Sequence, residues 1–277
     1  MTPTRVPRVM SIAGSDSGAG AGIQADLKTF GALGVFGTCA ITTVTAQNTV
    51  GVDAALPIPP AMVEAQIDAI MADIGADAVK TGMLPGADVI RCVAQRLEFH
   101  AVAAVVIDPV LVNRAGTRLF DDDALEAMRS ALFPRATVVT PNTCEASLLT
   151  GLEINTQDDL KNAAKALVEE LGARNAVVKG GRMEGPATDV LYDGSNFLTF
   201  TSERIDTPNN HGTGCTLASA IAAGLARGLA LPVAVQQAKD FVTAAMRASF
   251  PVGRGHGPLN HFHELWGRSA PPQEPSP

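Results

Sequence analysis

Residues 210–216 hold the part of this sequence best suited to chemistry. They read Asn-His-Gly-Thr-Gly-Cys-Thr and run directly into an apolar stretch with helical character, residues 217–229. Glycine lets the backbone approach a ligand closely, and the free amides at a helix start carry the positive end of the helix dipole. Gly212, Thr213 and Gly214 therefore predict a site for an anionic group.

Cys215 lies at the start of the same predicted helix, where the helix terminus favours the thiolate form of a thiol. A proton acceptor beside an anion site is typical of group transfer. The plainer interpretation is that glycine-rich turns often precede buried helices, and that a cysteine in an apolar stretch serves packing. The segment alone leaves both interpretations open.

A second glycine-rich loop, residues 14–26, follows the first predicted strand. Residues 20–25 match the G-x-G-x-x-G/A pattern of dinucleotide-binding loops, but that pattern also needs an acidic residue at the end of the second strand. The second strand ends instead at Gln47, whose amide suits a neutral heteroaromatic ring better than a ribose diol. The plain expectations for the two acids of the loop are an Asx turn at Asp16 and a solvated helix position at Asp26.

Three further strand ends carry polar side chains. Asp108 closes one strand, Asn142 and Glu145 follow the next, and Lys179 precedes two glycines after another. Oxygen ligands at strand ends suit Mg²⁺, which keeps most of its waters and bridges nucleotide phosphates, and Lys179 would lie beside the same phosphates. The alternatives are a capping box formed by Asn142 and Glu145, and a surface position for the lysine.

The elements that must position these residues follow an alternating pattern. Short apolar runs alternate with amphipathic stretches, which indicates βα units in a mostly parallel sheet with helices on both faces. An Asp193-Gly194 turn between two apolar runs predicts an antiparallel hairpin at one edge. Ligands in such sheets collect beyond the carboxyl ends of the strands, where all of these motifs lie. The expected strands are residues 8–13, 37–45, 78–82, 103–108, 137–140, 176–179, 188–192 and 197–201, and the expected last helices are residues 217–229, 233–249 and 259–266.

Length and composition set the domain organisation. With 277 residues and 46% hydrophobic content, the chain can bury one large core. We expect an N-terminal extension, residues 1–7, a single domain, residues 8–267, and a proline-rich tail, residues 268–277, that is disordered.

Charge and cysteine content exclude several classes of protein. A net charge of -7 without a Lys/Arg-rich run argues against nucleic acid and membrane surfaces as partners. Four widely spaced cysteines without a CxxC pair fit a reducing compartment, and the first residues and the hydropathy pattern lack a signal peptide and a membrane span. We therefore expect a cytoplasmic protein. The sequence contains no P-loop or protein-kinase motif, so phosphoryl transfer would need another architecture. The histidines form no convincing metal pattern, and core or surface roles account for His211, His256, His261 and His263.

Together these motifs closely resemble those of the hydroxymethylpyrimidine/phosphomethylpyrimidine kinases, of the ribokinase-like superfamily. The resemblance implies a three-layer α/β/α fold, usually homodimeric, acting in thiamine biosynthesis. It also implies two successive ATP-dependent phosphorylations, first of the pyrimidine's hydroxymethyl group and then of the monophosphate. It runs from about Val9 to Trp266 and rests on residues 11–16, 21–28, 46–49, 82–84, 108–110, 140–142, 179–181 and 211–216.

The same resemblance implies a role for each motif at the substrate. Asp26 and Gln47 look like the pair that reads the aminopyrimidine edge, and Gly14, Met83 and Val110 look like the walls around the ring.

The resemblance also implies a nucleotide site. Gly212, Thr213, Gly214 and Cys215 resemble the anion hole, with the cysteine where most ribokinase-like enzymes use an aspartate base. The remaining roles are an ATP-phosphate contact from Lys179, with Gly212 and Gly214 nearby, and a magnesium and phosphate network of Asp108, Asn142 and Glu145, in which Asp108 and Glu145 hold the metal through water.

Two departures from the family pattern stand out. A Lys-Ser-Gly flap is replaced by Arg114-Ala115-Gly116, which keeps a charge but loses the point-like geometry of lysine and a hydroxyl group. Asn210 replaces the usual threonine before the histidine. Flap closure, the tuning of the phosphate loop and any monovalent-cation requirement stay open.

Three other functions stay open at this stage. Pyridoxal kinase activity, alone or in addition, is the nearest, because pyridoxal also carries a hydroxymethyl group on a nitrogen heteroaromatic ring. An oxidoreductase would use the loop of residues 20–25, and a non-catalytic heterocycle-binding protein would keep the fold without turnover.

Overall fold

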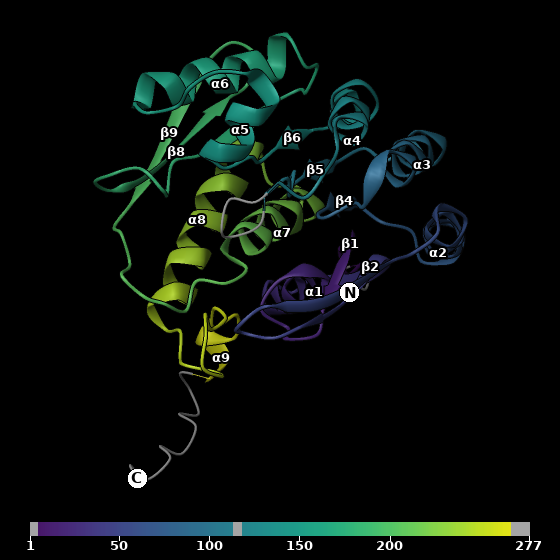
Figure 1. The fold of residues 1–277 in the computed structure, drawn as a ribbon, viewed down its shortest axis with the longest axis horizontal. Helices are drawn as coiled ribbons and strands as arrows, with labels where there is room; N and C mark the ends of the chain where they lie inside the picture. Colours follow the sequence, from purple (N-terminus) through teal and green to yellow (C-terminus); the bar gives the residue numbers. More distant parts are fainter. Residues whose placement is uncertain (1–4, 113–117, 267–277) are drawn as a thin grey trace, which may run out of the picture.

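A nine-stranded sheet forms the centre of the molecule (Figure 1). The structure is a computed structural model and describes residues 5–112 and 118–266. The strands are β1 (Arg8–Asp16), β2 (Phe36–Gln47), β3 (Val52–Pro57), β4 (Ala78–Thr81), β5 (Val105–Ile107), β6 (Val138–Val139), β7 (Ala176–Lys179), β8 (Ala187–Tyr192) and β9 (Phe197–Ser202). Their order is β3-β2-β1-β4-β5-β6-β7-β8-β9, and the strands from β2 to β7 are parallel. β3, β8 and β9 each pair with a neighbour in antiparallel fashion.

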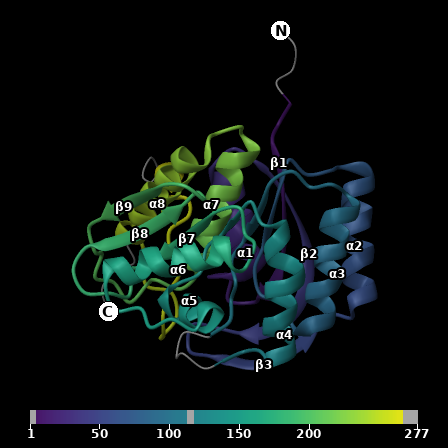
Figure 2. The same ribbon diagram turned by 90° about the horizontal axis from the view of Figure 1, so that it is seen from above.

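Helices cover both faces of this sheet. They are α1 (Gly22–Ala32), α2 (Pro60–Asp73), α3 (Gly86–Phe99), α4 (Asp122–Ala127), α5 (Thr143–Thr150), α6 (Gln157–Glu169), α7 (Thr213–Ala226), α8 (Leu231–Arg247) and α9 (His263–Trp266). Figure 2 shows the strands between the layer of α2 to α6 and the layer of α1, α7 and α8. Successive strand residues point to opposite faces, so Met10 packs with the first layer and Val9 with the second.

The predicted three-layer fold is confirmed in its main features. All six predicted parallel strands form, although the two runs expected over 103–108 and 137–140 are shorter strands, β5 and β6. The hairpin of β8 and β9 also forms. Its turn is held by the Asp193 carboxylate, which accepts hydrogen bonds from the backbone amides of Ser195 and Asn196 at 2.9 and 2.6 Å.

Several elements differ from the prediction. β3 adds a second antiparallel edge that the sequence did not reveal, because all six of its residues are exposed and show no buried alternation. α7 begins four residues before the predicted start, and α9 is shorter than the helix expected over 259–266. The expectations for the flap at Arg114 and Ala115 and for the tail, residues 268–277, fall outside the described residues. In the described part of the chain, no helix has the length and apolar content needed to cross a membrane.

Candidate active site

The start of α7 meets the first glycine loop at Gly212. This residue is the N-cap of α7 and has a left-handed backbone with φ of 87°. A Cβ atom there would lie 1.9 Å from the carbonyl oxygen of Gly20, so only glycine allows the two loops to come this close. The hydroxyl of Thr213 donates to the carbonyl of Asn210 at 2.7 Å, and the first intrahelical bond is donated by the Thr216 amide to the Gly212 carbonyl. The helix start is therefore held beside a second loop with first-turn amides that the helix itself does not use.

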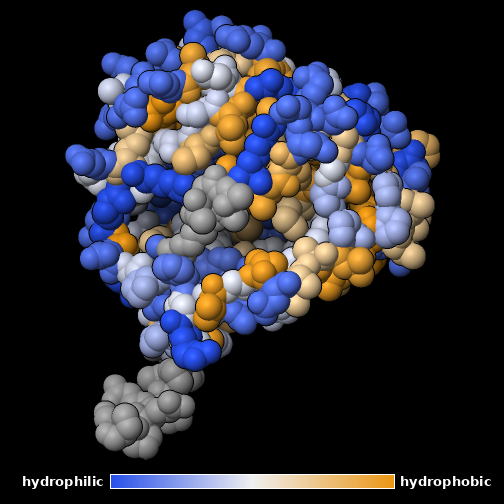
Figure 3. Space-filling model, in the orientation of Figure 1, coloured by the Kyte–Doolittle hydropathy of each residue, from blue (hydrophilic) through white to orange (hydrophobic). Residues whose placement is uncertain are grey.

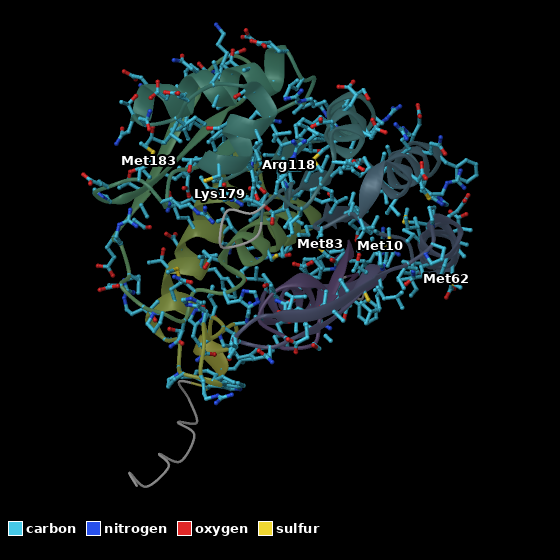
Figure 4. All side chains as sticks on the ribbon, viewed as in Figure 1. Met10, Met62, Met83, Arg118, Lys179 and Met183 are labelled. Atoms are coloured by element: carbon cyan, nitrogen blue, oxygen red, sulfur yellow. The ribbon has the colours of Figure 1, made fainter. Side chains whose placement is uncertain are left out.

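A cavity of about 560 Å³ opens at this helix start. It brings together side chains from the ends of several strands and from α7, as expected for an open α/β sheet. In Figure 4, the labelled Lys179 and Met83 lie on either side of α7 in the view. The predicted site residues that line the cavity are Asp108, Val110, Asn142, Glu145, Lys179, Gly212, Thr213, Gly214 and Cys215.

Lys179 and Asp108 form an ion pair at the wall of this cavity. The Lys179 Nζ atom lies 2.9 Å from Asp108 Oδ1, and the two side chains are 14% and 4% exposed. A Cβ atom on Gly214 would lie 3.2 Å from the same Nζ, which places the lysine against the first turn of α7. Burial opposes the charged form of Lys179, but the carboxylates of Asp108 and Glu145 outweigh burial and raise the pKa of the lysine. A cation, a carboxylate and free amides therefore meet at one point.

Glu145 is the second carboxyl group of the cavity and is only 4% exposed. It forms a complete capping box with Asn142: each side chain accepts a hydrogen bond from the other residue's backbone amide, at 2.8 and 3.0 Å. The structural alternative for this pair is thus confirmed. Burial and the charge of Asp108 raise the pKa of Glu145 to about 7, although Lys179 opposes the shift. The group therefore changes its proton occupancy near neutral pH.

The thiol of Cys215 is half-buried at the cavity wall. Burial raises its pKa to about 11, and the Lys80 ammonium group lowers it only in part. The expected shift towards thiolate at the helix start is therefore wrong for this chain, because loss of solvation outweighs the favourable charges nearby. At neutral pH Cys215 is a thiol.

Asp26 is buried rather than solvated. Its side chain is 0% exposed and accepts hydrogen bonds from both sides: from Lys80 Nζ at 3.0 and 2.9 Å, from Ser11 at 2.5 Å and from Ser219 at 2.7 Å. The expected solvated helix position is therefore wrong, because no part of the carboxylate reaches the surface. The substrate contact that the resemblance implies for Asp26 stays a prediction, and the residue is half of a buried ion pair.

Of the other predicted substrate residues, Val110 lines the cavity, whereas Gly14, Gln47 and Met83 are not among its lining residues. Gly14 packs against Met83, since a Cβ on the glycine would lie 2.7 Å from the terminal methyl group of the methionine. The amide of Gln47 lies 3.3 Å from Nε2 of His211, and His211 does line the cavity. Gln47 thus adjoins the cavity through His211.

Asp16 and His211 form a pair that sequence reasoning missed. Asp16 accepts hydrogen bonds from the amides of Gly18, Gly20 and Ala21, and Nε2 of His211 lies 3.0 Å from its carboxylate. Burial opposes ionisation, but these bonds outweigh it and lower the pKa of Asp16. The expected Asx turn is confirmed. Because Asp16 accepts the amides of Gly20 and Ala21, these two amides are not free to bind a pyrophosphate.

A second missed pair lines the cavity from the side of α8. Lys239 Nζ lies 2.7 Å from Asp189 Oδ2, and Asp189 Oδ1 accepts a hydrogen bond from the backbone amide of Gly180. No sequence pattern indicates this pair, because a single lysine in an amphipathic helix is normally a surface residue. The described residues hold no cluster of three or more His, Cys, Asp or Glu side chains placed to bind a metal ion.

Comparison with known proteins identifies the family. Residues 16–260 match the family described as phosphomethylpyrimidine kinase. The chain belongs to the phosphomethylpyrimidine kinase family. The hydroxymethylpyrimidine/phosphomethylpyrimidine kinase of Streptomyces coelicolor is 49% identical to it over 94% of this chain and 96% of its own length. The family predicted from the motifs is thus confirmed.

Two further relatives place this kinase chain among its neighbours. The thiamine biosynthesis bifunctional protein of Geobacter sulfurreducens is 49% identical over 92% of this chain. The match covers 52% of the length of that larger protein. Among solved structures, a pyridoxal kinase of Bacillus subtilis determined as an ADP complex superimposes with a TM-score of 0.88 and 42% identity, covering 94% of this chain and 99% of that one. The ribokinase-like fold and the use of ATP by a kinase of this family follow from these likenesses.

Proposed function

We propose that this kinase phosphorylates the hydroxymethyl group of 4-amino-5-hydroxymethyl-2-methylpyrimidine and then the resulting monophosphate, with ATP as donor, in thiamine biosynthesis. The observation that carries the proposal is the meeting of Lys179, Asp108 and the first-turn amides of α7 in one cavity, with Cys215 at its wall. Gln47 adjoins that cavity through His211, and its amide has the chemistry to bind a small heteroaromatic ring. The family membership supports the same reaction.

The chain's own residues account for the transfer by alignment and charge neutralisation. Phosphoryl transfer needs little covalent chemistry from the protein, and charge on the transferring oxygens dominates the barrier. The amides of Gly214 and Cys215 and the ammonium group of Lys179 would neutralise that charge in a partly water-excluded cavity. Cys215, a thiol at neutral pH, would position the substrate hydroxyl by hydrogen bonding rather than remove its proton at the outset.

Magnesium fits the oxygen ligands that the cavity offers. Mg²⁺ in kinases is held by one or two carboxylates, waters and substrate phosphates rather than by a complete protein cage. Asp108 and Glu145 would hold it through water, and it would supply charge neutralisation at the phosphates. Near neutral pH, Glu145 is partly protonated. It would lose this proton when the metal binds, because a nearby cation favours the carboxylate form.

Product analysis tests the proposed function. The protein is incubated with ATP, Mg²⁺ and either the aminopyrimidine alcohol, its monophosphate or pyridoxal, and ADP release and product mass are followed. We expect the pyrimidine monophosphate first and the diphosphate later. Lys179→Met should lower kcat/KM by about 100-fold or more, whereas Lys165→Met, at an exposed position of α6, serves as the matched control. ADP release only with pyridoxal would contradict the proposal.

Pyridoxal kinase activity is the second candidate, alone or in addition. The observation that favours it is the close superposition on a pyridoxal kinase. The ratio of kcat/KM for the two heterocycles decides between them, because contacts to the ring substituents differ in the transition state. A ratio near one would assign both activities to the chain.

We also propose that the chain forms a homodimer through the edge strand β3. Val52 and Leu56 of β3 are 57% and 66% exposed, and Val50 just before the strand is 70% exposed, so apolar side chains gather at this open edge of the sheet. Figure 3 shows hydrophobic residues, in orange, among the polar ones over the side where β2 and α2 lie. Leu56→Lys should convert a dimer to a monomer in light scattering, while Leu198→Lys on the opposite edge strand β9 should not. A monomeric unmodified protein would contradict this proposal.

A further inference from the structure

A short segment between α8 and α9 lies against the loop that begins α7 (Figure 1). We call this segment, residues 256–261, the strap, and residues 208–216 the anion loop. The backbone amide of His211 donates to the carbonyl of Gly257 at 3.1 Å, and His211 forms an isolated parallel β-bridge with Pro258. The strap therefore holds the beginning of the anion loop through the backbone.

The strap also holds the end of the anion loop, through a buried side-chain contact. The hydroxyl oxygen of Thr216 lies 3.0 Å from Nε2 of His261, and the two residues are 0% and 3% exposed. Burial lowers the pKa of His261 to about 4, so the imidazole is neutral at pH 7 and has one donor and one acceptor nitrogen. Because a hydroxyl group can donate or accept, it pairs with either nitrogen form.

The strap is itself anchored to the rest of the fold. The backbone amide of His256 donates to the carbonyl of Thr49 at 2.9 Å, and the amide of Asn260 donates to the carbonyl of Ala245 in α8 at 3.1 Å. Leu259 is 2% exposed and packs with the core residues of α1, α7 and α8. The position of the strap is therefore set by three parts of the molecule outside the anion loop.

Thr216 lies in the first turn of α7 but outside the cavity. Gly214 and Cys215 line the cavity, whereas neither Thr216 nor His261 is among its lining residues. Helix ends fray because their first amides have no partner within the helix. A buried bond to Thr216 restrains this first turn, and so the direction of its amides, without occupying the cavity.

We propose that His261 is a positioning residue of the phosphoryl-transfer site, acting through Thr216, and that the strap holds the anion loop at both ends so that the amides of Gly214 and Cys215 point at the transferred group. The inference rests on the proposed function in assigning these amides to the γ-phosphate of ATP. Donors that are already in place need no reorganisation when charge develops in the transition state. A displacement of about 1 Å caused by a distant substitution can cost about 100-fold in rate.

Steady-state kinetics with ATP and the aminopyrimidine test the proposal. Thr216→Val keeps the shape of the side chain but loses the hydroxyl, Thr216→Ser keeps the hydroxyl, and His261→Phe removes the ring nitrogens. We expect kcat to fall about tenfold in Thr216→Val and in His261→Phe, to fall no further in the double variant Thr216→Val/His261→Phe, and to stay within about twofold in Thr216→Ser.

A matched control and the double variant decide the kinetic result. Thr29→Val removes an equally buried hydroxyl from α1, which donates to the carbonyl of Ala25, and should keep kcat within about twofold. Circular dichroism confirms that each variant is folded at the assay temperature. Unchanged kcat in both single variants would overturn the proposal. Multiplied effects in the double variant would also overturn it, because Thr216 and His261 would then act independently.

Nucleotide binding separates positioning from general damage and needs no turnover. Isothermal titration calorimetry gives Kd for ADP and for an ATP analogue with a methylene bridge between its β- and γ-phosphorus atoms, and the ratio of the two reports contacts to the γ-phosphate. We expect Kd for ADP to stay within about twofold in Thr216→Val, while the preference for the analogue falls about fivefold.

The outcomes of the binding experiment are distinct. General damage to the site would weaken both nucleotides equally, and either this result or an unchanged preference would overturn the proposal. A protein with the expected change in preference that phosphorylates neither the pyrimidine alcohol nor its monophosphate would count against the proposed function alone.

Discussion

Removing one partner of the buried ion pair under the active site should reveal what that pair does. Lys80 and Asp26 are both 0% exposed, and the ammonium group lies 3.0 and 2.9 Å from the two carboxylate oxygens. Asp26 outweighs the effect of burial and raises the pKa of Lys80 above its usual range. Lys80→Met keeps the length of the side chain but leaves the carboxylate of Asp26 in the core without its cation.

The expected loss of stability follows from burial. An uncompensated buried charge costs about 3–5 kcal/mol, much more than an exposed ion pair contributes. For a chain of this length, about 2 °C of melting temperature corresponds to 1 kcal/mol, so Lys80→Met should melt about 6–10 °C lower. The hydroxyls of Ser11 and Ser219 still donate to Asp26 and keep the loss near the lower end.

The double variant Lys80→Met/Asp26→Leu provides the comparison. It removes both charges together, and replacement of a buried pair by apolar groups is often neutral or stabilising. We expect the double variant to recover most of the stability that Lys80→Met loses. About 1 kcal/mol should stay lost for each of the two serines, whose hydroxyl groups no longer have an acceptor. Urea unfolding followed by circular dichroism gives the free energy of unfolding for each variant, and differential scanning fluorimetry gives the melting temperature.

Steady-state kinetics with Asp26→Asn complete the test. Because Asp26 does not reach the cavity, the KM for the pyrimidine should stay within about twofold of the unmodified value well below the melting temperature. A tenfold rise in this KM with unchanged stability would refute the reasoning and support Asp26 as a substrate contact. A cost below about 1 kcal/mol for Lys80→Met would show that the pair is hydrated or easily rearranged.

Three further predictions concern the cavity itself. Gly212→Ala should lower kcat/KM by about 100-fold, because the added methyl group would lie 1.9 Å from the carbonyl oxygen of Gly20. Gly228→Ala is the control: Gly228 has a similar φ of 82° but open space around it, so this variant should keep near-normal activity. The pKa of the buried Glu145 is about 7 in the folded state, whereas its ordinary value is 4.5. Between these two pH values the folded protein keeps a proton that the unfolded chain has lost, so folding stability should fall as the pH rises from 4.5 to 7. In Glu145→Gln, this loss of stability with rising pH should be smaller. If urea unfolding gives the two proteins the same pH dependence of the free energy of unfolding, the prediction is contradicted. Cys215, with a pKa of about 11, should react slowly with iodoacetamide at pH 7.5 and faster as the pH rises to 10. Peptide mass spectrometry measures the alkylation, and the urea-unfolded chain is the control. Fast alkylation at pH 7.5 would show that Cys215 is a thiolate.

Local patterns predicted most of the sheet and the anion loop because the relevant physics is local. Gly212 is required by a backbone conformation, and the capping box of Asn142 and Glu145 follows from a three-residue spacing. β3 escaped prediction because strands without a buried face carry no alternation of apolar and polar residues. Its pairing with β2 comes from the tertiary arrangement rather than from its own side chains.

Short stretches of residue types are enough to predict the fold class, the family and the segments that form the cavity, since glycine loops, strand ends and helix starts each depend on a few neighbouring residues. The environment of each polar group depends instead on the tertiary structure. It made Asp26 the buried partner of Lys80, made Cys215 a neutral thiol, and joined Asp16 and Gln47 through His211, 195 and 164 residues away along the chain. The physical reason is that solvation and charge depend on neighbours in space. Burial and long-range partners set a group's protonation and hydrogen bonding, and neither is encoded in its own segment.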